Sequence, residues 1–449
     1  MKKNCIILAC KTGLLLGIYF LFSCGRKGIP TDNSDFIKLN FEPIQVIKIH
    51  ESFIGSGPCE PSISINPENL NQIVAGSVLD NVYVSLDAGY TWKKDKLKSS
   101  FGIYGDPVVR FNNKGDVFYA HLSNPSGKAY SSVEFLDRIV VQSSSDIGKT
   151  WSDGSFPPVD HLKDQDKPWM AIDYMSGDIL MAWTEFDKYA SKSRSDKSRI
   201  LFSTSNDNGK TWTKSMRISD IEGDCLDNDK TTEGAHPAVG IDGTYYLVWG
   251  FDGKIYLDLS KDKGKTWLGE DIRLAEQMGG WAFEIPGIGR CNGMPVMSCD
   301  HSQGKNRGNL YVSWSDQRNG AHDTDIWIIS SSDHAKTWSS PVRINSDGTG
   351  RHQFFSWMDV DQSTGYIYIV FYDRRNYNDN QTDVYLAYST NGGRNFENIK
   401  ISEIPFLPEP NVFFGDYNDI SVRNGKIRPI WTRLDNGRLC VQTAIIDVK

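Results

Sequence analysis

The chain has 449 residues, of which 23% are charged and 39% are hydrophobic, and its formal net charge is −7. This balance excludes a disordered tail-like protein, and the negative charge argues against nucleic acid as a partner. Aromatic residues make up 12% of the chain and glycine occurs 40 times, which indicates short strands joined by tight turns. No internal stretch of about 18 apolar residues occurs, so we expect no membrane span within the body of the protein.

The N-terminal segment has the pattern of an export signal. Lys2 and Lys3 give it a positive start, residues 14–22 are apolar, and Leu-Phe-Ser directly precedes Cys24. The last feature resembles a bacterial lipobox. The resemblance implies cleavage before Cys24, lipidation of that residue, and a protein held on a membrane of the bacterial cell envelope, either periplasmic or at the surface.

This interpretation divides the chain into a signal peptide (1–23), a polar tether (24–42) and one folded domain (43–449). An ordinary signal peptide or a retained transmembrane helix are the alternatives. Export permits disulfides, but no C-x-x-C motif occurs and the number of remaining cysteines is odd. The sequence therefore fixes no pairing among Cys59, Cys225, Cys291, Cys299 and Cys440.

An octet with the pattern Ser-x-Asp-x-Gly-x-Thr-Trp recurs six times. In the fifth copy Ala335 replaces glycine, and in the sixth Asn391 and Phe396 replace the aspartate and the tryptophan. A short carboxylate in a turn accepts bonds from nearby backbone N–H groups, so we expect these aspartates to stabilise turns and not to catalyse. The copies begin at Ser85, Ser144, Ser205, Ser260, Ser331 and Ser389.

The octet resembles the Asp-box of the sialidase superfamily and of other Asp-box propellers. Three short strands precede each copy, so the resemblance implies an all-β propeller of four-stranded antiparallel blades. Seven inner strands can be counted, and six blades, as in sialidases, are the alternative. They begin near Pro61, Pro107, Pro168, Pro237, Pro295, Ser356 and Asn418.

The last repeat has three strands and no octet, whereas residues 44–49 form a free strand near the N-terminus. We expect this strand to complete the last blade, because pairing the two ends of the chain closes the ring and removes exposed edges.

The residues just before the inner strands form a predicted ring around the axis, on the face opposite the octets. Charged side chains crowded around one axis are costly unless they are solvated or paired, so the ring is a candidate site, with an inert channel mouth as the alternative. Its members are Glu60, Asp106, Lys167, His236, Met294, Phe355 and Tyr417.

Two matching segments follow the second strands of neighbouring blades and contain Arg318 and Arg375. We expect these arginines to pair with Asp325 and Asp383 across a hairpin loop, with a clamp for a substrate carboxylate as the alternative. Arg290 and Arg351 precede inner strands and could join such a clamp.

The resemblance to sialidases implies a tyrosine nucleophile, a carboxylate base beside it and an aspartic acid as proton donor. Tyr417, Glu60 and Asp106 occur in that order around the ring and are assigned these roles, with His236, Lys167 and the four arginines as substrate-binding residues. The Arg-Ile-Pro signature of the family's first blade is absent, since the chain reads Cys-Glu-Pro-Ser there.

Two functions remain open: a sialidase-like glycoside hydrolase acting on a carbohydrate or glycoconjugate, and a non-catalytic propeller that binds a glycan or a protein or helps assembly. We expect a monomer without a cofactor. Glu60, Asp106 and His236 could together hold a divalent cation, but no local spacing supports this, so no metal is expected.

Overall fold

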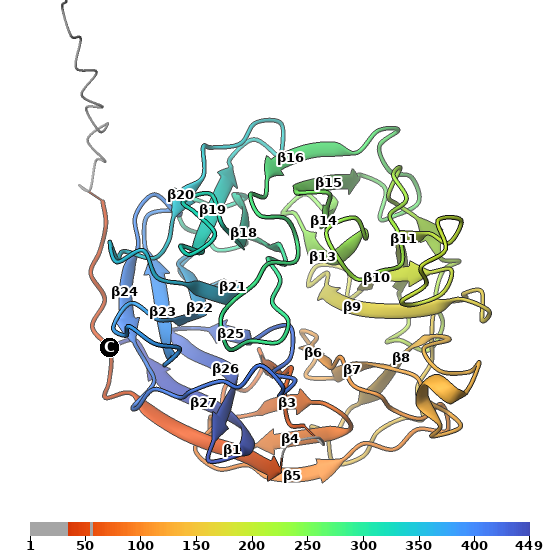
Figure 1. Ribbon diagram of the computed structural model, residues 1–449, viewed down its shortest axis with the longest axis horizontal. Coiled ribbons are helices and arrows are strands. Elements are labelled where there is room, and N and C mark those ends of the chain that lie inside the picture. The colour runs from red at the N-terminus through yellow and green to blue at the C-terminus, as the bar shows by residue number, and fades with distance from the viewer. Residues whose placement is uncertain (1–34, 54–56) are drawn as a thin grey trace, which may run out of the picture. The chain divides into compact units, whose positions relative to one another are not determined.

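The computed structural model describes residues 35–53 and 57–449, which form seven antiparallel sheets around one axis (Figure 1). Six sheets have four strands and one has three. The described residues contain one short 3₁₀ helix, Ala129–Ser131. These observations confirm the predicted seven-bladed, all-β propeller.

Each blade runs outward from the axis in the order of its strands. The first has β2 (Ser62–Ile65), β3 (Ile73–Ser77), β4 (Asn81–Ser85) and β5 (Lys93–Lys96), and the second has β6 (Val108–Phe111), β7 (Val117–Leu122) and β8 (Ile139–Ser144). The third has β9 (Asp164–Ile172), β10 (Ile179–Phe186), β11 (Ser198–Ser205) and β12 (Met216–Arg217). The fourth has β13 (Glu233–Val239), β14 (Tyr245–Phe251), β15 (Lys254–Ser260) and β16 (Ile272–Glu276). The fifth has β17 (Val296–Cys299), β18 (Leu310–Asp316), β19 (Asp325–Ser331) and β20 (Val342–Arg343). The sixth has β21 (Gln353–Val360), β22 (Ile367–Asp373), β23 (Asp383–Ser389) and β24 (Glu397–Lys400).

The seventh blade joins the two ends of the chain, as the sequence predicts. It contains β25 (Asp419–Arg423), β26 (Lys426–Asp435), β27 (Arg438–Asp447) and, outermost, β1 (Gln45–Phe53). In Figure 1 the red β1 lies beside the blue β27, and the register pairs Gln45 with Ile445. The contact supplies the missing fourth strand, so the ring is closed by hydrogen bonds.

The octets all form the same turn between the third and fourth strand positions. In the third blade the Ser205 hydroxyl donates to Asp207 at 2.8 Å, and the N–H and hydroxyl groups of Thr211 donate to the same carboxylate at 2.9 and 2.6 Å. The Lys210 N–H also donates to it at 3.0 Å, so the carboxylate accepts four bonds from its own turn, as the sequence predicts for a turn aspartate. The bonds from the serine and the threonine recur at Asp87, Asp146, Asp262 and Asp333.

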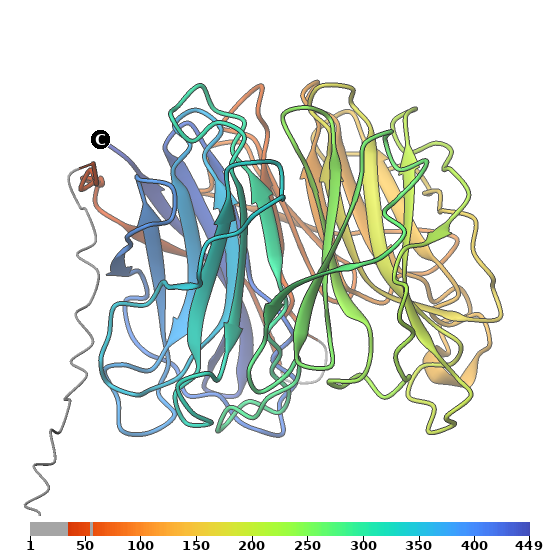
Figure 2. The same cartoon turned by 90° about the horizontal axis from the view of Figure 1, so that it is seen from above.

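The octet turns and the connections between first and second strands lie on one face, which we call the octet face. The opposite face carries the entrances to the inner strands and the loops between second and third strands. Figure 2 shows the blades from the side, with loops at both faces. The inner strands themselves surround the axis, so side chains at their two ends meet around it.

The starts of three inner strands and the end of the tether differ from the sequence-based expectation. β9, β13 and β21 begin at residues 164, 233 and 353, three or four residues before the predicted starts, because their pairing with the second strands is extended past an irregularity in register. Residues 36–41, which were assigned to the tether, contact the sixth and seventh blades. Phe36 and Phe41 pack on Tyr388, and Phe41 bridges to Val448.

The predicted signal peptide and Cys24 lie outside the described residues. Among the residues that the structure describes, no helix has the length and apolar character needed to cross a membrane. The five described cysteines are buried and none is joined in a disulfide.

Candidate functional site

A plug of aromatic side chains fills the middle of the axis and separates two cavities. Trp169 packs against Trp357 and Tyr417, with ring centroids 4.3 and 4.9 Å apart. His236 lies against the same two tryptophans at 5.8 and 5.5 Å. One cavity of about 380 Å³ opens between the ends of the inner strands on the octet face, and one of about 530 Å³ lies at their entrances.

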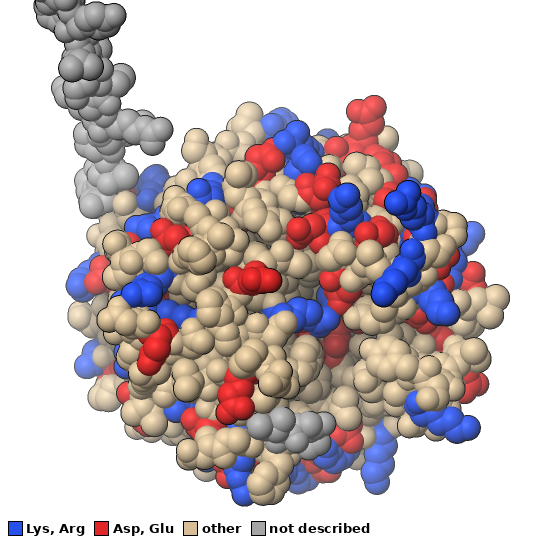
Figure 3. Space-filling model, viewed as in Figure 1, with Lys and Arg blue, Asp and Glu red and all other residues tan. Residues whose placement is uncertain are grey.

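The larger cavity is lined by three carboxyl groups and two cations. They belong to Glu60, Asp106, Asp166, Lys167 and Arg290, and we call this space the acid cavity. Figure 3 looks onto this face and shows acidic and basic side chains next to each other near its middle. The cavity lies where the sequence places the ring, on the face opposite the octets.

A repeated backbone turn brings the first three ring residues to this cavity. Glu60, Asp106 and Lys167 have φ values of 50°, 51° and 49°, and each directly precedes the proline at which the inner strand was predicted to begin. Residues other than glycine adopt this left-handed conformation rarely and at a cost of about 1–3 kcal/mol. Phe355, at the equivalent position of the sixth blade, has the same conformation with a φ of 50° and does not line the cavity, so the turn belongs to the repeat and brings the side chains of the first three blades to the cavity.

Lys167 is the electrostatic centre of the acid cavity. Its side chain is 6% exposed, and its ammonium nitrogen lies 3.4–3.8 Å from the carboxylates of four acidic residues. These contacts hold the pKa of Lys167 well above its usual range despite burial. The four residues are Asp166, Asp227, Glu233 and Asp416.

Arg290 joins two of the same carboxylates. Its Nε donates to Asp416 at 2.8 Å and its Nη1 to Asp227 at 2.6 Å, and a second guanidinium nitrogen also pairs with Asp416. The Tyr189 hydroxyl donates to Asp227 at 2.8 Å. The pKa of Asp227 is well below its usual range, because the charges of Lys167 and Arg290 outweigh its burial.

Several of the other carboxyl groups hold their protons more tightly than usual. Burial and the charge of Asp416 raise the pKa of Glu60 to about 8, and burial and the charge of Glu60 raise that of Asp106 well above its usual value. Glu233, which is fully buried, also has a strongly raised pKa, because burial and the charge of Asp227 disfavour its ionised form. At neutral pH the cavity therefore combines protonated and ionised carboxyl groups, which is the arrangement that acid–base catalysis uses.

One glycine fixes the position of Glu60. The N–H group of Asp416 donates to Glu60 Oε1 at 3.1 Å, and the preceding Gly415 has a φ of 91°. A Cβ atom at Gly415 would lie 2.6 Å from Glu60 Cγ, so the loop can approach this side chain only with glycine there.

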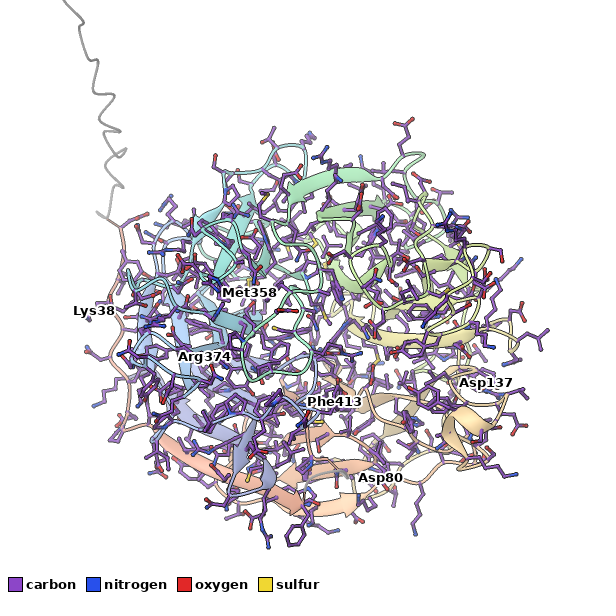
Figure 4. All side chains as sticks on the ribbon, viewed as in Figure 1. Lys38, Asp80, Asp137, Met358, Arg374 and Phe413 are labelled. Carbon is purple, nitrogen blue, oxygen red and sulfur yellow. The ribbon has the colours of Figure 1, made fainter. Side chains whose placement is uncertain are left out.

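Aromatic side chains surround the mouth of the acid cavity. Tyr104, Tyr130, Tyr189 and Phe413 all contribute to its lining. Tyr130 and Phe413 are 68% and 51% exposed, and Phe413, labelled in Figure 4, lies close to the middle of the ring. The Arg290 guanidinium lies 5.4 Å from the centre of the Phe413 ring. Such rings can stack on the faces of sugars or on organic cations.

Two of the five ring residues that were assigned a catalytic or binding role do not line the acid cavity. His236 lines the octet-face cavity because β13 already begins at Glu233, which places His236 further along the strand. Its Nδ1 accepts the Met297 N–H at 3.4 Å, and burial lowers its pKa to about 3. Tyr417 belongs to the aromatic plug, and its hydroxyl donates to the Pro107 carbonyl at 3.5 Å.

The predicted pairing of Arg318 with Asp325 and of Arg375 with Asp383 is wrong. Each arginine instead pairs with the aspartate two residues before it, Asp316 or Asp373, at 2.5 and 2.6 Å. The backbone N–H of each arginine also donates to that aspartate, so the turn after the strand folds the side chain back onto its own strand end.

Asn345 and Asn319 donate to Asp325, and Ser402 and Tyr377 donate to Asp383. The two axial cavities are not lined by Arg318, Arg375 or Arg351. The Arg351 guanidinium donates to Asn378 at 2.6 Å. Of the four candidate arginines, only Arg290 belongs to the acid cavity.

Sequence reasoning missed Asp166, Asp227, Glu233 and Asp416. Asp166 and Asp416 each directly precede a predicted ring residue, which is the one signal that could have found them. Within residues 35–53 and 57–449, no three His, Cys, Asp or Glu side chains form a group suited to a metal ion.

No family model matches the chain, and no curated protein matches its sequence. A solved structure of a protein of unknown function from Dyadobacter fermentans is 14% identical, with a TM-score of 0.49 over 90% of this chain and 99% of that one. The Penicillium chrysogenum α-L-arabinanase complexed with arabinobiose is 15% identical, with a TM-score of 0.47 over 80% and 98%.

The intramolecular trans-sialidase from Ruminococcus gnavus is 11% identical, with a TM-score of 0.48 over 77% of this chain and 95% of that one. At these identities the likenesses concern the β-propeller fold alone, and we transfer no residue role from them.

Proposed function

We propose that this protein is a glycoside hydrolase that acts on a carbohydrate in the acid cavity. The observation that carries the proposal is the pair of lining carboxyl groups, Glu60 and Asp106, that keep protons at neutral pH in a cavity of about 530 Å³. A glycosidic bond breaks slowly unless the leaving oxygen receives a proton. The reaction therefore needs a carboxylic acid whose pKa is raised enough to keep its proton at neutral pH.

Asp106 is the proton donor in this proposal, and Glu60 holds a second proton beside it. Asp166 is the base in this proposal, because it lies 3.8 Å from the Lys167 ammonium, whose charge opposes the rise in the pKa of Asp166 that burial causes. As the C–O bond to the leaving sugar breaks, Asp106 gives its proton to the leaving oxygen. A water molecule adds to the sugar carbon and gives a proton to Asp166.

The nucleophile role expected for Tyr417 is not part of this proposal. Its hydroxyl lies against the Pro107 carbonyl and its ring is buried in the aromatic plug. A neutral tyrosine is useful where the substrate carries a carboxylate at the reacting carbon. A substrate that is not an anion does not require a neutral nucleophile, so the carboxyl groups of the cavity suffice.

The test is a screen of chromogenic glycosides and envelope polysaccharides with three proteins. Wild type and Asp242→Asn, a matched exchange at a carboxylate on the octet face that is 43% exposed, should release the same product. Asp106→Asn should lose about 10²–10⁴-fold in rate, as expected for removal of a general acid. Equal rates for Asp106→Asn and wild type would exclude the acid cavity as the reaction site.

A non-catalytic glycan-binding propeller is the second candidate. Tyr130 and Phe413 favour it, because exposed aromatic rings at a cavity mouth suit a binding surface as well as an enzyme subsite. Under this alternative the Tyr130→Ala variant would lose glycan binding, and wild type would hydrolyse none of the glycans that it binds.

We also propose that the protein is an exported lipoprotein anchored through Cys24. The support is the Leu-Phe-Ser-Cys sequence after an apolar run with a basic start. Mass spectrometry of the mature N-terminus should find a diacyl-modified Cys24, and an unmodified Cys24 or cleavage elsewhere would contradict this proposal.

A further inference from the structure

We infer that the sugar bound in the acid cavity carries a protonated amine and not a carboxylate. This inference rests on the proposed function, since it names the substrate class of the same cavity. It concerns an amino sugar whose nitrogen is not acetylated, and it excludes acidic sugars such as sialic acids and uronic acids.

The charges around the cavity are the first argument. Six acidic side chains surround it and only two basic ones, Lys167 and Arg290, lie among them. With Glu60, Asp106 and Glu233 holding their protons, three acidic side chains remain to balance the two cations, so the cavity offers an additional anion no excess positive charge. The acidic residues are Glu60, Asp106, Asp166, Asp227, Glu233 and Asp416.

Both cations are already occupied by the protein. Lys167 has four carboxylates within 3.8 Å, and Arg290 donates to Asp227 and Asp416 from both sides of its guanidinium group. A substrate carboxylate would have to displace a buried ion pair to reach either of them, which is costly. The cavity therefore lacks the free arginines with which a carboxylate clamp is built.

A separate argument comes from hydrogen bonding, because carboxyl oxygens that line the cavity lack hydrogen-bond donors. Glu60 is 3% exposed, and of its two oxygens only Oε1 receives a hydrogen bond within the described part of the chain. Asp106 receives none there, although its carboxyl group lines the same cavity. These carboxyl oxygens line the cavity, where an ammonium group with three N–H donors could bind them.

The aromatic mouth fits the same ligand. Tyr104, Tyr130 and Phe413 line the same cavity as the carboxyl groups, and the ring centroids of Tyr104 and Tyr130 are 6.4 Å apart. Aromatic faces attract cations and stack on the apolar faces of sugar rings, whereas they give an anion no favourable contact. An amino sugar uses both properties.

The experiment is titration calorimetry of the full chain with three probes: the disaccharide of glucosamine, the disaccharide of N-acetylglucosamine, and N-acetylneuraminic acid. Titrations in two buffers of different ionisation enthalpy report the protons exchanged. We expect the glucosamine disaccharide to bind at least about tenfold more tightly than the other two at pH 7. It should also release protons, because its charge lowers the pKa of Glu60 and Asp106.

Two variants and one control complete the design. Asp106→Asn should remove the tenfold preference for the glucosamine disaccharide. Tyr130→Ala, at an exposed position, should weaken binding of this disaccharide several-fold, and Asp242→Asn should leave all three affinities unchanged. Circular dichroism melting checks that each variant is folded.

Equal affinity for the acetylated probe, tighter binding of the acidic sugar, or no binding of glucosamine disaccharide at millimolar concentration would each overturn the inference. Because these are binding measurements, the proposed function is tested separately. Preferred binding without hydrolysis of any glycan would keep the inference and refute the hydrolase, whereas hydrolysis of a neutral glycan with no preference for the amine would do the opposite.

Discussion

Replacing Glu60 with glutamine should stabilise the protein in a strongly pH-dependent way. The pKa of Glu60 is about 8 in the folded protein, against an ordinary value of 4.5. The folded state thus holds the proton more tightly than the unfolded chain. Its contribution to stability is fully present below pH 4.5 and is lost as the pH rises to 8 and beyond.

The size of the effect follows from these two values. At pH 8 the unfolded chain gains about 4.8 kcal/mol from ionising this group and the folded protein gains about 0.4 kcal/mol, a difference of about 4 kcal/mol. Glutamine never ionises, and its amide oxygen can still accept the bond that the Asp416 N–H donates to Glu60. Glu60→Gln should therefore match wild type near pH 4 and exceed its stability by about 4 kcal/mol at pH 8.

Guanidinium unfolding at a series of pH values from 4 to 9 measures this difference, with Glu403→Gln as the matched exchange at an exposed position on the same face. A stability difference between Glu60→Gln and wild type that stays constant over this range would refute the reasoning. So would a difference that grows in the opposite direction, with wild type the more stable protein at pH 8.

Three further variants test the packing and the ion pairs. Lys167→Met should lower the free energy of unfolding by about 3–5 kcal/mol, because it removes the buried cation that four acidic side chains share. An unchanged denaturation midpoint would contradict the role of Lys167. Asp207→Ala should lower the free energy of unfolding by about 2 kcal/mol, because the turn bonds to Ser205 and Thr211 are lost. Asn391→Ala in the degraded octet should lower it less, and calorimetric melting compares the two variants. Trp169→Ala should lower the free energy of unfolding by about 3–5 kcal/mol and join the two axial cavities. A loss of stability below about 1 kcal/mol would show that the aromatic plug is not tightly packed.

The repeat made the fold predictable from the sequence. Each octet fixes one turn by bonds within eight residues, and the prolines at the inner-strand entrances mark the other end of the blade. The free strand at residues 44–49 and the incomplete last repeat then specified the closure with β27. These are local signals, so no knowledge of distant contacts was needed.

The candidate site was predictable only where it follows the same repeat. Glu60, Asp106 and Lys167 occupy equivalent positions before inner strands, and all three line the acid cavity. Asp227 lies in the long loop before β13 and Glu233 is the first residue of that strand, and both positions depend on contacts with Lys167 or Arg290. No spacing in the sequence reports such contacts.

The sequence pattern also could not predict which aspartates the two arginines bind. Arg318 and Arg375 lie within reach of two aspartates each, one before and one after them in the sequence. Which one they bind depends on the backbone of the turn, which directs both the N–H and the guanidinium group of each arginine to the preceding aspartate.

A crystal structure of Asp106→Asn with a glycan that wild type hydrolyses would test the central claim most directly. We predict that the sugar lies in the cavity lined by Glu60, Asp166 and Arg290, with its glycosidic oxygen next to residue 106 and a ring against Tyr130 or Phe413. A sugar bound instead in the octet-face cavity beside His236, or on the outer strands with the acid cavity empty, would contradict the account.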